Sequence, residues 1–195
     1  MHKPRGPLSA AHDQRGRQTV VDLLGGIGAR LYPAGRLDAD TEGLLIITND
    51  GDLTLRLTHP RHGVEKVYEA EVEGKPSAAA LGQLRRGVVL DDGPAGPAHV
   101  RMVRAGDQAS RVELTVHAGR KRMVRRMLKA VGHPVISLKR TRVGPLTLGN
   151  LEPGGWRHAT PDEVKGLYRA AEITAASEHG GGESDLARSS RRGQR

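Results

Sequence analysis

The chain has 195 residues, a formal net charge of +9 and no cysteine, which excludes disulfide bonds, cysteine-ligated zinc and thiol catalysis. Its length suits one ordinary domain, or two small lobes that share a sheet, and its 36% hydrophobic content, with no phenylalanine, predicts an aliphatic core. No apolar run approaches the ~20 residues of a membrane span and no signal peptide is recognised, so we expect a cytoplasmic protein without membrane contact.

The basic charge favours a polyanionic partner. Lysine and arginine number 31 against 22 acidic residues, and cationic side chains bind nucleic acid by releasing the counterions condensed on its phosphates. The alternative is a basic surface that serves solubility only. An acidic membrane fits less well, because the sequence contains no long basic amphipathic helix.

The first third of the chain combines loops, a buried run and one undecided segment. Residues 2–8 resemble a short strand, but their two prolines and one glycine suit a loop better than a central strand. The glycine cluster 25–28 predicts a helix stop and turn, since it lacks the ending and spacing of phosphate-binding loops. The apolar run 44–47 predicts a buried strand. Residues 53–57 alternate like a strand, yet Asp52 could cap a short helix there, and periodicity leaves both open.

The middle of the chain alternates between strand and helix patterns. Residues 64–72 have the period of a strand, which places Lys66 and Tyr68 side by side on one face. A helix is predicted at 77–86, followed by strands at 88–90, 100–102 and 112–116.

Helix 122–131 is the most informative predicted element, because it combines a buried stripe with a cationic face. The stripe contains Met123, Val124, Met127, Leu128 and Val131, and the cationic face contains Arg122, Arg125, Arg126 and Lys129.

A strand at 135–143 and a last helix complete the prediction. Thr160 as N-cap, Pro161 at the first helical position and Glu163 form a capping box, and the helix should reach about Ala175. The basic tail 177–195 has too little apolar content to pack and is predicted to be disordered. Strands outnumber helices without regular alternation, so the predicted fold is α+β with a mixed, mainly antiparallel sheet and flanking helices.

Two carboxylates, Asp38 and Asp40, lie in a polar loop just before the buried run, where a sheet would fix them and leave them accessible. For a loop aspartate the ordinary role is to cap a turn. The neighbouring Arg36, the cationic Arg125 and the basic composition favour catalysis instead, because a guanidinium can hold a nucleophilic carboxylate ionised beside an anionic substrate.

Other candidates are less specific. Tyr68 is one of three tyrosines and can either stack on an extruded base or belong to the core. The loop 119–122 suits phosphate contacts, although a solvated face would look similar. His59 and His62 have no third ligand at a recognisable spacing, so no metal site is predicted.

Several motifs together resemble the RsuA-type pseudouridine synthases, which modify ribosomal RNA. The long segment from Gly35-Arg36-Leu37-Asp38-Ala39-Asp40-Thr41 to Asn49-Asp50-Gly51 is similar to the family signature. Further similarities, in the family's order over residues 1 to about 170, are Lys3-Pro4-Arg5-Gly6, Glu65-Lys66-Val67-Tyr68, Gly119-Arg120-Lys121-Arg122 with the helix after it, and Val131-Gly132-His133-Pro134.

The resemblance implies a role for each matching residue. Asp38 would be the catalytic aspartate, Tyr68 would pack against the target base and Arg125 would pair with the aspartate. The RNA-binding residues implied are Lys3, Arg36, Lys66, Arg120, Arg122 and Arg126.

The resemblance also implies an activity. A catalytic domain at 1–176, with the pseudouridine synthase fold and a central RNA-binding cleft, would isomerise a uridine of ribosomal RNA, with the large-subunit RNA favoured, to pseudouridine. It would act as a monomer and without cofactor or metal. The alternative is a non-catalytic RNA-binding or ribosome-assembly factor, and a generic basic nucleic-acid binder is a third hypothesis.

Two departures from the family pattern are expected to matter. The family usually begins with an S4-type RNA-binding domain, whereas this chain starts at the Lys-Pro motif, which suggests a truncated or misassigned start and impaired RNA affinity or target choice. In the third motif, Ala118 and Met123 replace an acidic residue and a glutamine. We expect altered support of that loop, with catalysis retained.

Overall fold

A computed structural model describes residues 1–25, 27 and 29–179. A seven-stranded sheet forms its centre, with the strand order β1-β3-β10-β5-β9-β8 and β11 beside β10. The β3–β10 pair is parallel and the other pairs of this sheet are antiparallel, so the predicted mixed, mainly antiparallel sheet is confirmed. The strands are β1 (His2–Lys3), β3 (Glu42–Leu44), β5 (Lys66–Glu73), β8 (His99–Arg104), β9 (Ala109–Val116), β10 (Val135–Val143) and β11 (Leu146–Thr147).

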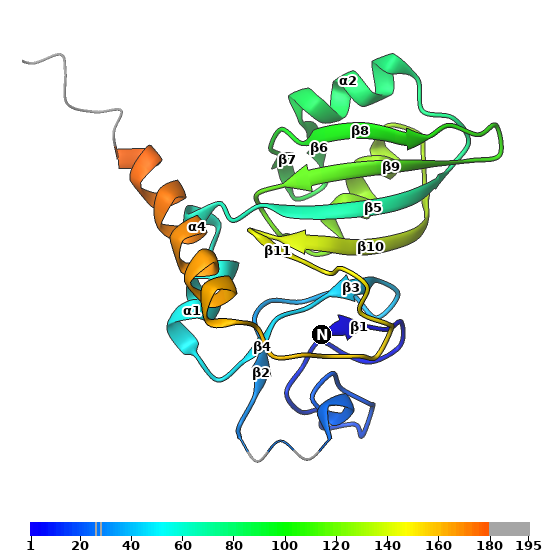
Figure 1. Cartoon of the computed structure of the whole chain (residues 1–195). Helices are drawn as coiled ribbons and strands as arrows, with labels where there is room; N and C mark the ends of the chain where they lie inside the picture. The colour runs from blue at the N-terminus through cyan, green and yellow to red at the C-terminus, as the bar shows by residue number, and fades with distance from the viewer. Residues whose placement is uncertain (26, 28, 180–195) are drawn as a thin grey trace, which may run out of the picture.

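Helices and two small ribbons surround the sheet (Figure 1). Helices α2 and α3 pack with the β6–β7 ribbon against one part of the sheet, and α1 and α4 pack together beside it. The helices are α1 (Gly51–Thr58), α2 (Ala78–Arg86), α3 (Met123–Ala130) and α4 (Pro161–His179), with short 3-10 turns η1 (Asp22–Leu24) and η2 (Pro60–His62). The ribbons are β2 (Tyr32–Pro33) with β4 (Ile47–Thr48), and β6 (Val88–Leu90) with β7 (Gly93–Ala95).

Three aliphatic cores hold these elements together. The largest joins the sheet to α2 and α3 and buries Leu84, Leu114 and Met127 completely. The second joins α1 and α4 through Leu57 and Leu167, and the third lies under the N-terminal segment. Burial of such side chains provides roughly 1.5–3 kcal/mol each. The cores therefore fix the elements around a pocket that lies where they meet.

The expectation was wrong for the run 44–47 and incomplete for residues 2–8, two segments that depend on distant partners. His2 and Lys3 form a strand at the sheet edge, paired with Leu44 and Gly43, and the proline directly after them is tolerated because an edge strand needs only one partner. The run 44–47 is not one strand, because the chain leaves β3 at Leu44 and enters the separate β2–β4 ribbon.

The undecided segment 53–57 is helical. Asp50, and not Asp52, is the N-cap of α1, because its carboxylate accepts the Leu53 N–H at 3.0 Å. Leu53 and Leu57 are buried one turn apart, whereas Leu55 is exposed.

Most periodic elements are confirmed. Helix α3 buries four of the five predicted apolar residues, and Val131 is half-buried. The capping box of α4 is present, with Thr160 N–H donating to Glu163 at 2.8 Å and Glu163 N–H donating to the Thr160 hydroxyl at 3.2 Å.

The end of the chain differs from the prediction. Helix α4 continues to His179, so residues 177–179 of the predicted tail are helical, and 180–195 lie outside the described residues. Gly26 and Gly28 of the glycine cluster lie outside them as well, while Gly25 ends η1. In the part of the chain that the structure describes, no helix is long and apolar enough to cross a membrane.

Candidate active site

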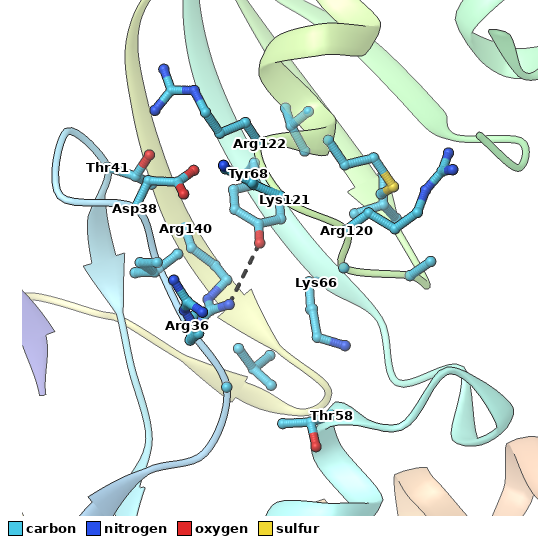
Figure 2. Close-up of a pocket in the computed structure, with 18 of the residues that line it drawn as sticks. Arg36, Asp38, Thr41, Thr58, Lys66, Tyr68, Arg120, Lys121, Arg122 and Arg140 are labelled. Carbon is cyan, nitrogen blue, oxygen red and sulfur yellow. Dashed lines mark hydrogen bonds between the residues drawn. The ribbon is translucent and has the colours of Figure 1, made fainter. Parts of the chain in front are cut away.

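A pocket of about 350 Å³ opens between the loop that contains Asp38, the end of α1, strands β5 and β10, and the loop before α3. Figure 2 shows Asp38 on one side, with its carboxylate directed toward the Tyr68 ring, and Lys66 near Thr58 below. The polar lining is Arg36, Asp38, Thr41, Thr58, Lys66, Tyr68, Arg120, Lys121, Arg122 and Arg140, and the rest of the lining is mainly aliphatic.

Hydrogen bonds to its carbonyl oxygens hold the backbone of the loop 37–41 in place. Each carbonyl oxygen from 37 to 41 accepts a hydrogen bond, and four of the five donors come from outside the loop. In order, Leu37 accepts from the Ser9 hydroxyl (2.8 Å), Asp38 from Thr41 N–H (3.0 Å), Ala39 from Gly6 N–H (2.8 Å), Asp40 from Arg125 (2.9 Å) and Thr41 from Lys3 (3.1 Å). Such a loop holds its side chains in place without help from the substrate.

The two aspartates of the loop have opposite environments. The Asp38 carboxylate is half-buried at the pocket and has no hydrogen bond or ion pair within the described residues. The Asp40 carboxylate accepts two hydrogen bonds from Arg122, at 2.9 and 2.8 Å. These bonds, with the nearby Arg125 charge, hold the pKa of Asp40 below its ordinary value. Asp38 is therefore the carboxylate that is available to a substrate.

The expected pair of Arg125 with Asp38 is not formed among the described residues. Arg125 donates to the Asp40 carbonyl at 2.9 Å and to the Thr41 hydroxyl at 3.4 Å, and it lies 3.5 Å from the Asp40 carboxylate. The predicted partner of Arg125 was wrong. Arg125 lies 85 residues from Asp40 in the sequence, and over such a separation the sequence does not show whether it meets Asp38 or Asp40. Arg125 supports the loop from behind and is not part of the pocket lining.

Arg140 lines the pocket, and the sequence analysis did not name it. It is 3% exposed on β10, donates to the Leu44 carbonyl at 2.8 Å and makes a long contact of 3.5 Å to the Tyr68 hydroxyl. Its guanidinium also lies 6.0 Å from the Tyr68 ring centre. The sequence could have revealed Arg140 through its position, because it stands two residues after the buried Leu138, where strand alternation would place an apolar side chain.

A glycine lets β3 approach Arg140 this closely. Gly43 has φ +117°, and a Cβ there would lie 2.3 Å from the Arg140 carbonyl oxygen, far inside contact distance. The close approach brings the loop of Asp38 next to Arg140 and Tyr68. The glycine after Glu42 therefore has a direct part in building the site.

Lys66 and Tyr68 lie side by side on β5, as the alternation predicted, and both line the pocket. The Lys66 ammonium donates to the Val64 carbonyl at 2.9 Å. Burial, with a smaller contribution from the Arg140 charge, lowers the pKa of Lys66 from 10.5 to about 8.

The remaining predicted RNA contacts separate into two groups. Arg36 and Arg122 line the pocket, and so does Lys121, which was not among the predicted site residues. Arg126 pairs with Asp91 and Asp92 of the β6–β7 turn, away from the pocket lining.

Arg120 and Lys3 are engaged by the protein itself. Arg120 lines the pocket, but its guanidinium donates to the carbonyls of Asp92, Gly93 and Pro94 and points away from Asp38 (Figure 2). The prediction of RNA contact is wrong for Lys3 in this structure, because its side chain is completely buried under the loop.

Ala118 and Met123, the two departures in the third motif, both line the pocket and add apolar surface to it. The loop between them is held by Arg120 through the β6–β7 turn and by Arg122 through Asp40. Among the described residues, no group of three or more His, Cys, Asp and Glu side chains is placed to hold a metal ion.

The site thus presents one free carboxylate, an aromatic ring and several cations around a small pocket. The model of the family described as RNA pseudouridylate synthase matches residues 1–130. The chain belongs to this family. The predicted enzyme class, an isomerase of RNA uridine, and the predicted fold are thereby confirmed.

Individual relatives agree. The chain is 45% identical to the ribosomal large subunit pseudouridine synthase B of Bacillus subtilis over 88% of this chain and 71% of that protein. It is 40% identical to the ribosomal large subunit pseudouridine synthase E of Xanthomonas campestris over 80% of this chain and 92% of that protein. A crystal structure of a pseudouridylate synthase superposes with a TM-score of 0.77 and 31% identity, covering 86% of this chain and 71% of the other.

Proposed function

We propose that the protein isomerises a uridine of large-subunit ribosomal RNA to pseudouridine, with Asp38 as the nucleophile. The observation that carries the proposal is the free Asp38 carboxylate on a loop whose carbonyls are all bonded, facing Tyr68. The choice of RNA is supported by the two relatives named ribosomal large subunit pseudouridine synthases.

The reaction needs no oxidant or cofactor. The bond from uracil N1 to the ribose is broken, the base turns, and a bond from C5 to the same sugar carbon is made, while C5 loses a proton and N1 gains one. A nucleophilic carboxylate divides such a reaction into two easier steps. Asp38 supplies that group at a fixed position.

The pocket volume of about 350 Å³ suits one small ligand, so the target nucleotide must leave the RNA stack to reach Asp38. In this proposal Tyr68 packs on the extruded base, and Arg140 positions the Tyr68 ring. Arg36, Lys66 and Lys121 surround the entrance as contacts for the RNA phosphates, which attract cations whatever the sequence. We also propose that the protein acts as a monomer and in the cytoplasm.

The test uses the full chain and large-subunit ribosomal RNA. Pseudouridine is mapped by chemical adduct formation and primer extension after incubation with the wild type and with Asp38→Asn, which keeps the shape of the side chain and removes its charge. We expect a new pseudouridine with the wild type and none with the variant. Identical patterns for the two proteins would contradict the proposal and favour a non-catalytic RNA-binding factor.

A further inference from the structure

The two sides of the pocket are held in different ways. On one side, each carbonyl oxygen of the loop 37–41 accepts a hydrogen bond. On the other side, the loop 118–122 has little such support. Within the described residues, the backbone of 118–121 takes part in one hydrogen bond, from the Met123 N–H to the Arg120 carbonyl at 3.1 Å. All five residues of this loop nevertheless line the pocket, so side chains are left to hold it in place.

Arg120 connects this loop to the turn between β6 and β7. Its guanidinium donates to the carbonyls of Asp92 (3.0 Å), Gly93 (3.2 Å) and Pro94 (3.0 Å), and it lies 2.9 Å from the Asp92 carboxylate. Figure 2 shows the Arg120 side chain directed away from Asp38. With four oxygen atoms of one turn around it, this guanidinium has few N–H groups left for a phosphate.

Arg126 ties α3 to the same turn. It pairs with the Asp91 carboxylate, and its two terminal nitrogens lie 2.8 and 2.9 Å from the two carboxylate oxygens of Asp92. The hydrogen bond from Arg126, with the charges of both arginines, holds the pKa of Asp92 below its ordinary value. Two arginines and two aspartates thus form one network, which is the case in which partly exposed ion pairs matter.

The β6–β7 ribbon itself is unsuited to RNA phosphates. Residues 87–97 contain two aspartates and no lysine, arginine or histidine. The ribbon packs beside α3, and its Leu90 and Ala95 are buried in the largest core. The charges of Arg120 and Arg126 are balanced by the two aspartates, so little of their field is left for a polyanion. The network therefore acts within the protein, between the ribbon and the pocket wall.

We infer that Asp92, Arg120 and Arg126 form a brace that positions the loop 118–122 against the β6–β7 turn, and that these two arginines do not contact RNA. This differs from the role that the family resemblance implies for them. The inference concerns one wall of the pocket, and its effect on rate rests on the proposed function. Displacement of this wall would change the space that the target base enters, and a misplacement of ~1 Å can lower a rate by about 100-fold.

Substitutions of opposite charge within the brace distinguish positioning from phosphate contact. Asp92→Asn removes a negative charge and Arg126→Gln removes a positive one. Single-turnover pseudouridine formation at saturating RNA is measured for both, together with RNA affinity over a range of salt concentrations. We expect both variants to lower the rate by about 10- to 100-fold and to leave the slope of log affinity against log salt unchanged. A phosphate contact would instead reduce the slope by about one in Arg126→Gln and leave the rate of Asp92→Asn unchanged.

Conservative variants sharpen the distinction. Arg126→Lys keeps the charge but presents one ammonium in place of a planar fork, so it cannot hold both aspartates and should recover little of the rate. A phosphate contact, in contrast, would be restored by lysine. Asp92→Glu keeps the carboxylate and should recover part of the rate. Asp92→Asn combined with Arg126→Gln should add little to either single effect, because both changes break the same network.

Glu113→Gln and Arg101→Gln are the matched controls. They break an arginine–carboxylate pair, 3.2 Å apart, between β8 and β9 and outside the pocket lining. Both should keep the wild-type rate. Melting curves of all variants give the unfolded fraction at the assay temperature. A rate loss in the brace variants that is no larger than this fraction explains would be a folding defect and would contradict the inference.

Failure of the inference can be told apart from failure of the proposed function. If the wild type forms no pseudouridine, the proposed function fails, and the brace is judged by the backbone order parameter of the Gly119 amide in the wild type and in Asp92→Asn, measured by NMR relaxation. We expect a lower value in the variant, because the loop loses its side-chain support. A wild-type rate for Asp92→Asn, a slope reduced by about one in Arg126→Gln, or an unchanged order parameter of Gly119 would overturn the inference.

Discussion

The two faces of the central sheet each contain a hollow, and they differ in how their charges are paired. The hollow on the far face has a volume of about 800 Å³. Its charged lining consists of the strand residues Glu69, Glu113, Lys139 and Arg142, with Glu152 at its edge. Alternate residues of β5 line the two hollows, so these lie on opposite faces. Each of the four strand side chains has an ion-pair partner, namely Arg111, Arg101, Glu42 and Glu65 respectively, at 3.0 to 3.5 Å.

The pocket face is paired only in part: among its charged side chains, Arg120 and Arg122 have ion-pair partners, Asp92 and Asp40 respectively. Asp38 is unpaired, and Arg36 and Lys121 have no ion-pair partner among the described residues. Charge that is neutralised within a sheet, as for Arg101 and the directly opposed Glu113, stabilises strand pairing but leaves little field for a polyanion. The net charge of +9 is typical of a protein with a polyanionic partner, and the unpaired charges predict that the pocket face is the one that meets the RNA.

Apart from the loss of Asp38 itself, the substitution on the pocket face with the largest expected effect on rate or RNA affinity is at Tyr68. Tyr68→Ala removes the ring and should lower the single-turnover rate or the affinity by about 5- to 150-fold, since stacking on a base contributes roughly 1–3 kcal/mol. Tyr68→Phe loses only the long 3.5 Å contact to Arg140 and should remain close to the wild type. Wild-type activity of both variants would remove the ring from the mechanism.

The salt dependence of RNA binding tests the pairing argument directly. Arg36→Ala and Lys121→Ala should each reduce the slope of log affinity against log salt by about one, the value for one lost phosphate contact. Arg101→Ala removes a paired far-face arginine and should leave the slope unchanged. The measurement is a titration of RNA binding at several salt concentrations. A slope that changes equally for all three would mean that both faces contact RNA.

The smallest effect is a pH dependence from Lys66. Because its pKa is lowered to about 8, the ammonium loses its charge as the pH rises through that value, and RNA affinity should fall over the same range. Lys66→Gln should be weaker at neutral pH and lack this step.

The free energy of unfolding should rise with pH, whereas the RNA affinity should fall. The pKa of Lys66 in the fold lies below the ordinary 10.5, so between about 8 and 10.5 the unfolded chain binds more protons and the free energy of unfolding rises with pH. Melting curves of the wild type and Lys66→Gln across this range measure it. A pH profile that Lys66→Gln does not alter would contradict the account of Lys66.

Local patterns predicted much of this structure from the sequence. The period of two placed Lys66 beside Tyr68, the helical period gave α3 its buried and cationic sides, and the capping box placed the start of α4. The predictions failed where the outcome depends on residues far along the chain. The β1 edge strand needs Leu44, and the partner of Arg125 depends on how β3 and β10 align. Arg140 was missed because its burial is compensated by Leu44 and Tyr68, which only the fold brings near.

The most direct test of the account compares one carboxylate from each face. Single-turnover formation of pseudouridine in large-subunit ribosomal RNA is measured for the wild type, Asp38→Asn and Glu113→Gln, with RNA affinity and melting temperature measured in parallel. We predict a loss on the order of 10⁴-fold or more for Asp38→Asn at near-normal affinity, as for the removal of a catalytic nucleophile, and a wild-type rate for Glu113→Gln. Asp38→Asn with the same activity as Glu113→Gln would contradict the account.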